Sequence, residues 1–327
     1  MIKRRTFLAS AAATAAATLA APALAQAPDR VSFRFNWSWI GNYSPPILGL
    51  QRGYYRDVGI DLRPDQGKGS GVTVRQVGSK GDMFAWADTS ALLLAAAQGV
   101  QAKQIMTMAI STLAVVWIDG RTKFETARDV IGKKVCGTAG DGATQLWPAV
   151  LAANGIKPTD YEMFNVDSTA GVAALREGRC DILLGSAADQ PVSLQNAGFA
   201  AKYKTYKDLG VPTLGSGIST HPDLIRDNPG LVRRFVQATQ RSWQAAIDDP
   251  EASVQALVKH AETPLDPKVV RGNLAVFTTL LTGVKPLGMT DPAAMEKNIA
   301  LLKEYTGFKT DLPATHFYTN DFVGQSA

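Results

Sequence analysis

The segment from Phe33 to Pro46, FRFNWSWIGNYSPP, interleaves aromatic rings with amide and hydroxyl groups directly after a short apolar run. Indole faces can stack on a flat molecule, and amides beside them can form hydrogen bonds with its edges. The same tryptophans could instead fill the core at the end of an ordinary strand. The candidates for a ligand wall in this segment are Asn36, Trp37, Trp39, Asn42 and Tyr43.

Polar side chains also recur where the other predicted strands end. In open α/β sheets, ligands bind beyond the carboxyl ends of the strands, so these residues are predicted to face one site. For each of them alone, a helix cap or a turn is the alternative role, as for Ser90 before an apolar helix. The further candidates are Gly69, Ser70, Asp88, Thr89, Ser111, Thr138, Asp141, Thr144, Asp167, Ser186 and Asp189.

The chemistry of this set favours one kind of ligand. It combines amide, hydroxyl, carboxylate and aromatic groups, and Lys68 is the main cation near it. Such a lining suits a flat molecule with N–H donors better than a sulfonate or a nitrate ion. The glycine loop at 67–71 can bring backbone close to a ligand, and backbone N–H groups can hold an anion, so an anionic ligand is the alternative.

The sequence contains neither a Gly-x-Ser-x-Gly nucleophile turn nor a Gly-x-x-x-x-Gly-Lys-Ser/Thr phosphate loop. Its three histidines are far apart, and none pairs with cysteine or glutamate at ligand spacing, so we expect no metal and no cofactor. An exported protein could form one disulfide. Cys136 and Cys180 nevertheless fall at different heights on the predicted strands, so we expect them not to be bonded.

Short strands alternate with helices from Val31 to about Leu209, as in a mainly parallel sheet covered by helices. From His221 onward, apolar residues recur at three- and four-residue spacing, which predicts helices, and Asp291 with Pro292 is predicted to begin one of them. The predicted strands are 31–35, 60–64, 83–87, 103–109, 112–119, 133–137, 161–166 and 181–185. The predicted helices are 45–55, 72–77, 90–98, 144–154, 171–177, 231–247 and 292–302.

The first 25 residues have the composition of an export signal. Lys3, Arg4 and Arg5 precede an uncharged, Ala-rich stretch, and Ala23 to Ala25 supply small residues for cleavage. We expect the mature chain to begin at Gln26 or Pro28, after either a twin-arginine or an ordinary secretory leader. Removing the leader leaves 31 basic against 29 acidic residues, a charge of about +2. No dense Lys/Arg tract follows, which argues against a nucleic-acid partner.

The span from Arg34 to Gly99 resembles the solute-binding proteins of ABC importers that handle nitrate, sulfonates, taurine and thiamine-pyrimidine precursors. GKKVCG (132–137) and ALREGRCDILLG (174–185) match the second half of the same family. The other matching pieces are the aromatic residue after the first strand, Gly53-Tyr54-Tyr55, Val58-Gly59-Ile60, the Gly69-Ser70 loop, Gly81-Asp82 and the turn at Gly99.

The resemblance implies an α/β fold of the type II periplasmic-binding-protein kind, with two lobes that close over one small molecule. Each lobe would be a mainly parallel sheet covered by helices, and the helical C-terminal region would pack on the first lobe. We place the first lobe at 28–118, the second lobe at 119–212 and the return to the first lobe at 213–327. The hinges are then expected near Asp119–Arg121 and Gly210–Thr213.

The same resemblance implies a periplasmic, non-enzymatic monomer whose partners are a small-molecule solute, a membrane permease and its ATPase. Contact with the membrane would occur only through that permease. The preferred solute is planar and contains nitrogen, like a thiamine precursor, and a sulfonate, taurine or nitrate is the alternative. A third possibility is an enzyme like the thiamine-pyrimidine synthases, which would need pyridoxal phosphate or iron; their cysteine cluster is missing here. A chaperone or sensor module would bind no small molecule tightly.

Overall fold

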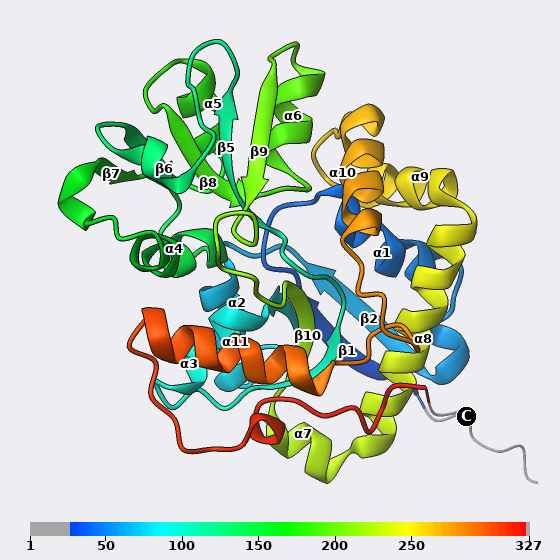
Figure 1. Ribbon diagram of the computed structural model, residues 1–327. Helices are drawn as coiled ribbons and strands as arrows, with labels where there is room; N and C mark the ends of the chain where they lie inside the picture. The colour runs from blue at the N-terminus through cyan, green and yellow to red at the C-terminus, as the bar shows by residue number, and fades with distance from the viewer. Residues whose placement is uncertain (1–26, 325–327) are drawn as a thin grey trace, which may run out of the picture.

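Two five-stranded sheets, each covered by helices, form the framework of the protein (Figure 1). The computed structural model describes residues 27–324, so the predicted leader, 1–25, lies outside the described residues. Each sheet is the centre of one lobe, which confirms the predicted two-lobed α/β class. No helix in the described range is long and apolar enough to cross a membrane.

The first lobe is built on a sheet with the strand order β2-β1-β3-β10-β4. β1 pairs in parallel with β2 and β3, whereas β10 runs antiparallel to β3 and β4. Four strands therefore point one way, and β10, which sequence analysis did not predict, makes the sheet mixed. The elements are β1 (Asp29–Arg34), β2 (Ile60–Asp65), β3 (Phe84–Asp88), β4 (Lys103–Thr107), β10 (Ser216–Thr220), α1 (Ser44–Gln51), α2 (Ser70–Gly78) and α3 (Thr89–Ala96).

The second lobe repeats this arrangement with the strand order β7-β6-β8-β5-β9. β6 pairs in parallel with β7 and β8, and β5 runs antiparallel to β8 and β9. The strand β9 was not predicted from the local sequence pattern. The elements are β5 (Leu113–Ile118), β6 (Lys134–Gly137), β7 (Glu162–Asn165), β8 (Ile182–Ser186), β9 (Ala201–Thr205), α4 (Gly142–Ala153), α5 (Gly171–Arg176) and α6 (Gln190–Asn196).

Two segments cross between the lobes, at 108–112 and 206–215. They lie side by side, because the backbone N–H of Ser111 donates to the carbonyl of Thr213 at 3.1 Å. The second crossing contains the predicted hinge at Gly210–Thr213. The first crossing differs from the expected one: β5 belongs to the second sheet, so the chain changes lobes before Leu113 and not after Ile118. The fully buried run of β5 satisfies its backbone groups against β8 and β9.

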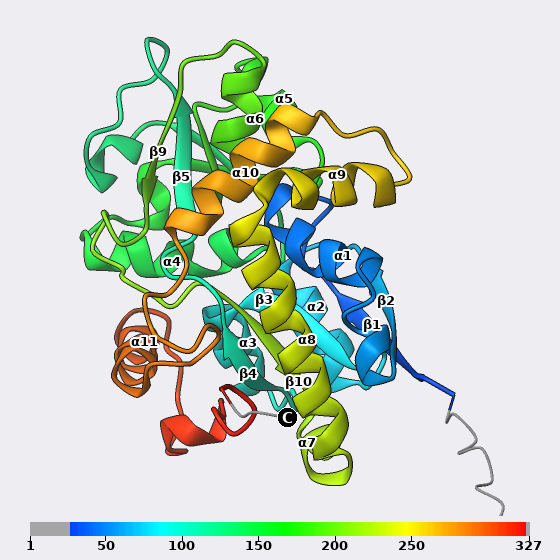
Figure 2. The ribbon, with the colours of Figure 1, turned by 90° about the vertical axis from the view of Figure 1, so that its right-hand side faces the viewer.

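Five helices follow β10, and all begin with a proline preceded by a capping side chain. The side chain of Asp291 accepts a hydrogen bond from the Ala293 N–H, which confirms the predicted start of α11. Figure 2 shows the long α8 running along the first lobe, where α8 and α9 pack on α1. The helices are α7 (Pro222–Asp227), α8 (Pro229–Asp248), α9 (Pro250–His260), α10 (Pro267–Thr279) and α11 (Pro292–Tyr305).

The C-terminal helices pack on the first lobe, as expected, but two of them also contact the second lobe. α10 packs on α6, and α11 packs on α4. Figure 2 shows α10 lying across the boundary between the lobes. The helices α10 and α11 therefore contact both lobes.

Cys136 and Cys180 form a disulfide, so the expectation that they are not bonded was wrong. Cys136 lies on β6, whereas Cys180 precedes β8 and lies in the turn before it. Because β6 and β8 are adjacent, with Cys136 opposite Leu183, that turn brings the two cysteine Cα atoms to 6.0 Å. Both side chains are buried with Ala174, Leu175 and other apolar residues of the second lobe.

Candidate ligand-binding site

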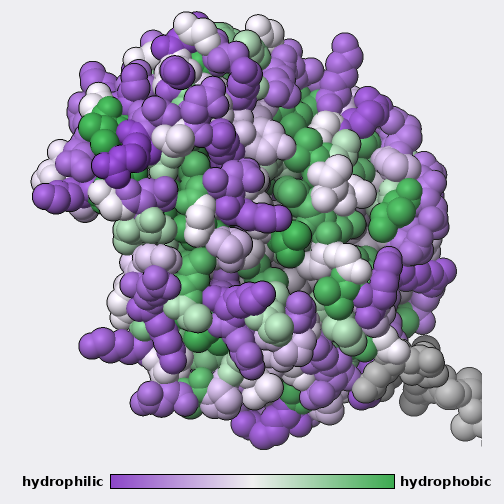
Figure 3. All heavy atoms as spheres, in the orientation of Figure 1, coloured by the Kyte–Doolittle hydropathy of each residue, from purple (hydrophilic) through white to green (hydrophobic). Residues whose placement is uncertain are grey.

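A cavity of about 330 Å³ lies between the lobes, and residues of both lobes and of α10 line it. The first lobe contributes the segment after β1, including the short helix Gly41–Tyr43. The second lobe contributes the carboxyl ends of β6 and β8 and the starts of α4, α5 and α6. Figure 3 shows hydrophobic residues gathered between the lobes on one face, with a hydrophilic rim around them. A volume of this size fits a small organic molecule.

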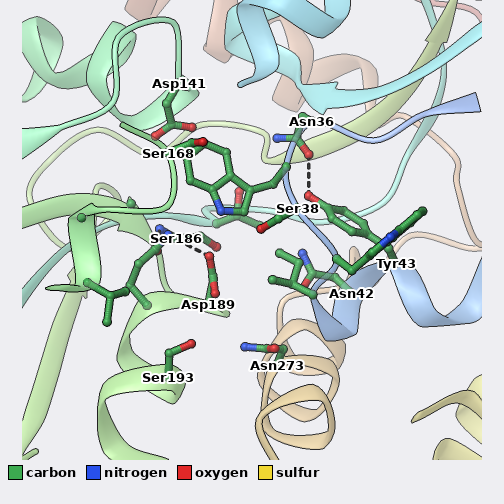
Figure 4. A pocket seen from close by; sticks show the side chains of 18 of the residues that line it. Asn36, Ser38, Asn42, Tyr43, Asp141, Ser168, Ser186, Asp189, Ser193 and Asn273 are labelled. Carbon is green, nitrogen blue, oxygen red and sulfur yellow. Dashed lines mark hydrogen bonds between the residues drawn. The ribbon is translucent and has the colours of Figure 1, made fainter. Parts of the chain in front are cut away.

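Ten predicted site residues lie on the wall of this cavity. They lie at the ends of three strands (β3, β6 and β8) or in the aromatic segment after β1, so the rule that ligands bind beyond strand carboxyl ends leads to this cavity. Figure 4 shows several of them converging from the two lobes. The ten are Asn36, Trp37, Trp39, Asn42, Tyr43, Asp88, Thr138, Asp141, Ser186 and Asp189.

Two further predicted residues, Gly69 and Ser70, lie elsewhere, because their loop touches the second lobe and not the cavity. The backbone N–H of Gly71 donates to the carbonyl of Gly140 at 3.1 Å. A Cβ atom at Gly69 would lie 2.8 Å from that same oxygen, and the φ angle of Gly69 is +118°. Glycine is thus required for close approach of the two lobes. Lys68 does not line the cavity either.

The remaining four predicted residues also lie off the wall. Thr89 is buried and donates to the carbonyl of Gly215 and to Gln104. Ser111 belongs to the first crossing segment, and the hydroxyl of Thr144 is buried without a hydrogen-bond partner. Asp167 is exposed. Strand-end position is therefore insufficient, since the turn after each strand decides which side chain faces the cavity.

A chain of buried hydrogen bonds runs behind the wall in the first lobe. Tyr43 donates its hydroxyl to Asn36 Oδ1 at 2.8 Å, and Asn36 Nδ2 donates to Ser70 Oγ at 2.8 Å. Ser70 in turn donates to Asp88 Oδ2 at 2.7 Å. This chain holds Asn36 and Tyr43 in fixed orientations, as Figure 4 shows for the Tyr43–Asn36 bond.

Asp88 is the best-satisfied carboxylate of the cavity. Besides Ser70, the hydroxyls of Thr112 and Ser216 donate to its Oδ1 at 3.3 and 3.4 Å. Burial raises the pKa of Asp88, and the three hydroxyls oppose this rise. Because these partners come from α2, the first crossing segment and β10, Asp88 joins three parts of the framework near the hinge.

Asp141 and Asp189 are less well satisfied. Burial raises the pKa of each to about 7, and the charges of Asp88 and Asp189 add to the rise for Asp141. Asp141 keeps part of its surface open to the cavity although protein surrounds it, and Asp189 is only 7 % exposed. Burial, followed by the charges of Asp189, Asp88 and Asp141, raises the pKa of Tyr43 well above its ordinary value. The carboxyls of Asp141 and Asp189 are therefore only partly ionised near pH 7.

None of the described residues that line the cavity has a positively charged side chain. Its lining in the described chain includes four aspartates (Asp88, Asp141, Asp189 and Asp266) and no lysine, arginine or histidine. No group of three or more His, Cys, Asp or Glu side chains within residues 27–324 is arranged to hold a metal ion. The lining can thus accept N–H donors or a positive charge, while carboxylates would repel an anion.

The contribution of α10 to the cavity was not predicted from the sequence. Asn273, 1 % exposed, donates through Nδ2 to the carbonyl of Ala188 in the second lobe at 2.7 Å. Its Oδ1 accepts from the N–H of Gly41 in the first lobe at 3.3 Å. Figure 4 shows Asn273 opposite Ser193 at one end of the cavity. An asparagine on the apolar face of a helix is the available signal, but the sequence does not show which segments it joins.

A fold of two lobes around a lined cavity, with two crossing segments, defines a solute-binding protein of the periplasmic type. The chain matches the family model described as NMT1/THI5 like over residues 41–253, and it belongs to that family.

Three known proteins show what the chain is similar to. The riboflavin-binding protein RibY of Chloroflexus aurantiacus is 25 % identical over 321 residues, covering 94 % of this chain and 91 % of that protein. The 4-amino-5-hydroxymethyl-2-methylpyrimidine phosphate synthase of Legionella pneumophila is 22 % identical over 268 residues, covering 80 % and 84 %. The periplasmic aliphatic sulphonate-binding protein SsuA of Escherichia coli superposes with a TM-score of 0.69 at 13 % identity, covering 92 % and 95 %.

Proposed function

We infer that this protein is an extracytoplasmic receptor that delivers a small, planar, nitrogen-containing solute to an ABC import permease. The observation that carries this proposal is the cavity between the lobes, which is lined by two indoles and four aspartates and by no basic residue of the described chain. An aromatic ring can stack on an indole, and its N–H edges can donate to carboxylate and amide oxygens.

The cellular setting of the proposal rests on the export-type leader and on the family. The sulphonate-binding relative is periplasmic by name, and RibY is by name a binding protein. We propose that the mature chain is likewise periplasmic, is released from its leader at Gln26 or Pro28, and meets a permease and its ATPase as a monomer. N-terminal sequencing of the exported protein checks the cleavage site, and retention of Met1 would contradict it.

An anionic solute, such as a sulfonate, taurine or nitrate, fits this cavity less well. The sulphonate-binding relative shares only the fold, at 13 % identity. Here an anion would lie beside the carboxylates of Asp88, Asp141 and Asp189 without a neighbouring lysine, arginine or histidine in the cavity lining that the structure describes. Like charges within several ångströms disfavour such binding.

An enzymatic role has support only from the resemblance to the Legionella synthase. A reaction that depends on a free thiol has no candidate here, because the two cysteines of the chain are joined in a disulfide within the second lobe. The proposed receptor function therefore does not include catalysis.

Mass spectrometry of solute released from the purified protein by mild denaturation tests the receptor function. We expect one planar, nitrogen-containing compound, and isothermal titration of the emptied protein with that compound should give saturable one-to-one binding. A released sulfonate or nitrate that rebinds would support the anion alternative. A protein that binds no small molecule would contradict the receptor function.

A further inference from the structure

We propose that the solute carries a positive charge on an ammonium, amidinium or similar N–H-bearing group, and that Asp141 and Asp189 bind this group. The proposal deepens the receptor function and rests on it. It adds the sign of the charge and the two carboxylates that recognise it, both contributed by the second lobe.

Asp189 presents one oxygen to the cavity and has the other one held in place. Gln190 Nε2 donates to Asp189 Oδ2 at 2.8 Å, and Gln190 Oε1 accepts from the Ser186 N–H at 2.7 Å. These two bonds fix the carboxylate relative to the end of β8. Its Oδ1 has no hydrogen-bond partner in the described part of the chain, although the residue is only 7 % exposed. A buried carboxylate with an open oxygen is a preorganised acceptor for an N–H group.

Asp141 lies on the same side of the cavity as Asp189, at the start of α4 (Figure 4). The backbone N–H groups of Gly142 and Ala143 offset only part of the effect of burial and of the neighbouring charges, so the pKa of Asp141 stays near 7. Asp88 differs from both, because three hydroxyls already satisfy its oxygens. The two aspartates of the second lobe are thus the ones that need a partner from the solute.

Asn42 gives an independent indication of a missing donor. It lines the same cavity from the first lobe and is 5 % exposed, yet its Oδ1 has no hydrogen-bond partner among residues 27–324. An enclosed amide oxygen without a donor is unfavourable. The two ends of the amide exchange by rotation, so its oxygen can turn toward the cavity. A solute with N–H groups on two edges would satisfy Asn42 in one lobe and the aspartates in the other.

A positively charged solute complements the aspartates of the cavity lining best. Asp88 and Asp266 add to the negative charge of the lining, and the described residues contribute no lysine, arginine or histidine to it. A neutral solute would leave the buried carboxyls of Asp141 and Asp189 without a counter-charge, and an anion would repel their ionised forms. A cation would form charge-assisted hydrogen bonds with them, which are the stronger kind.

Three probes with the same phenyl ring test the charge: benzamidine, benzamide and benzenesulfonate, cationic, neutral and anionic respectively. Isothermal titration at pH 7.5 of the full mature protein, emptied of co-purified solute, measures each affinity. We expect benzamidine to bind the tightest. Asp141→Asn and Asp189→Asn should each weaken it by about 10- to 100-fold, because each removes a charge-assisted acceptor.

Asp167→Asn is the matched control, because it removes the same charge from an exposed residue of the same lobe that does not line the cavity. It should bind benzamidine as the wild type does. Asp189→Glu, which keeps the charge, provides a second variant if an asparagine variant melts at a lower temperature. Tighter binding of benzamide or benzenesulfonate, or wild-type affinity in both asparagine variants, would overturn the proposal and leave the receptor function intact. Absence of saturable binding by every probe and by the co-purified solute would instead contradict the receptor function itself.

Discussion

The two tryptophans of the segment after β1 have different surroundings, and this predicts different roles. Trp37 is partly exposed and lines the cavity. Trp39 also reaches the cavity but is 8 % exposed, with its ring edge-on to Phe35 at 5.6 Å and to His260 at 5.1 Å between centroids. Trp37 is therefore placed for a ligand wall, whereas Trp39 is packed as at an ordinary strand end.

Trp37→Ala should weaken binding of the solute by about one to two orders of magnitude, because it removes a stacking surface worth about 1–3 kcal/mol. Its melting temperature should stay close to that of the wild type. Trp39→Ala should lower the free energy of unfolding by about 3–5 kcal/mol. Titration calorimetry and thermal melts separate the two effects. Wild-type affinity in Trp37→Ala would reject the stacking role.

The unliganded protein should lose stability as the pH rises from about 4 to about 7. Asp141 and Asp189 have folded-state pKa values near 7, raised from 3.8, so in this range the native state holds protons that the unfolded chain has released. Each of the two carboxyl groups should lower the free energy of unfolding by about 4 kcal/mol as the pH rises across this range. Below pH 4 both states hold these protons, and above pH 7 neither does.

Asp189→Asn removes one of the two titrating carboxyl groups. Comparing its melting temperature with that of the wild type isolates the contribution of Asp189. His221 and His260, whose pKa values burial lowers, favour the opposite trend in the same range. The difference in melting temperature between variant and wild type should therefore favour the variant more at pH 8 than at pH 5. An equal difference at both pH values would show that Asp189 does not titrate in this range.

At the scale of elements, the contact between α6 and α10 closes one side of the cavity. Asn273 bonds the carbonyl of Ala188, and Asn196 Nδ2 donates to Asp266 Oδ2 at 2.8 Å. Gly272 allows this approach, since a Cβ atom there would lie 2.5 Å from Cγ1 of Val192. The helices meet only because one of them lacks a side chain at the crossing point.

Gly272→Val should hold α6 and α10 apart and weaken solute binding by about tenfold or more, while each lobe keeps its own core. Val192→Ala in the same chain should restore part of the affinity, because it removes the opposing methyl groups. Titration of the two single variants and the double variant measures this coupling. Additive effects, without rescue, would show that the contact does not govern binding.

The disulfide belongs to the second lobe and should act on stability more than on binding. It joins residues separated by 44 positions, and neither cysteine lines the cavity. The double variant Cys136→Ser with Cys180→Ser should lose about 2–4 kcal/mol of unfolding free energy. Solute affinity should change by less than about threefold, which is about 0.6 kcal/mol. Denaturant unfolding with and without reductant checks the first value; unchanged stability would contradict it.

At the scale of the whole molecule, the lobes touch on both sides of the cavity, through Gly71 with Gly140 and through α6 with α10. A wider opening between the lobes requires that at least one of these contacts break. The crossing segments at 108–112 and 206–215 are the places where the backbone can bend. The structure thus has the contacts of a closed arrangement.

Small-angle scattering should give a larger radius of gyration for the solute-free protein than for the saturated one. The physical reason is that contacts with the solute from both lobes favour the closed state, and only that difference in affinity can shift the equilibrium. Gly272→Val is the control, since it should stay expanded with solute present. An unchanged radius of the wild type at saturation would contradict hinge closure without excluding binding.

The type and order of most elements, and the region of the candidate site, could be predicted from the amino-acid sequence. Strand runs such as 112–119 and helix starts such as Asp291-Pro292 are local patterns, so they could be predicted from neighbouring residues. Asn36, Asp141 and Asp189 lie at the cavity because they follow the carboxyl ends of strands, and the strands of one lobe mostly point the same way.

Which distant segments meet could be seen only in the folded structure. β5 joins the second lobe because it pairs with β8 and β9, and Cys180 reaches Cys136 through the adjacency of β6 and β8. Gly69 approaches Gly140, and Asn273 joins Gly41 to Ala188, across residues far apart in the chain. Such contacts depend on packing and on backbone pairing between remote positions, and local residue patterns carry no record of the partner.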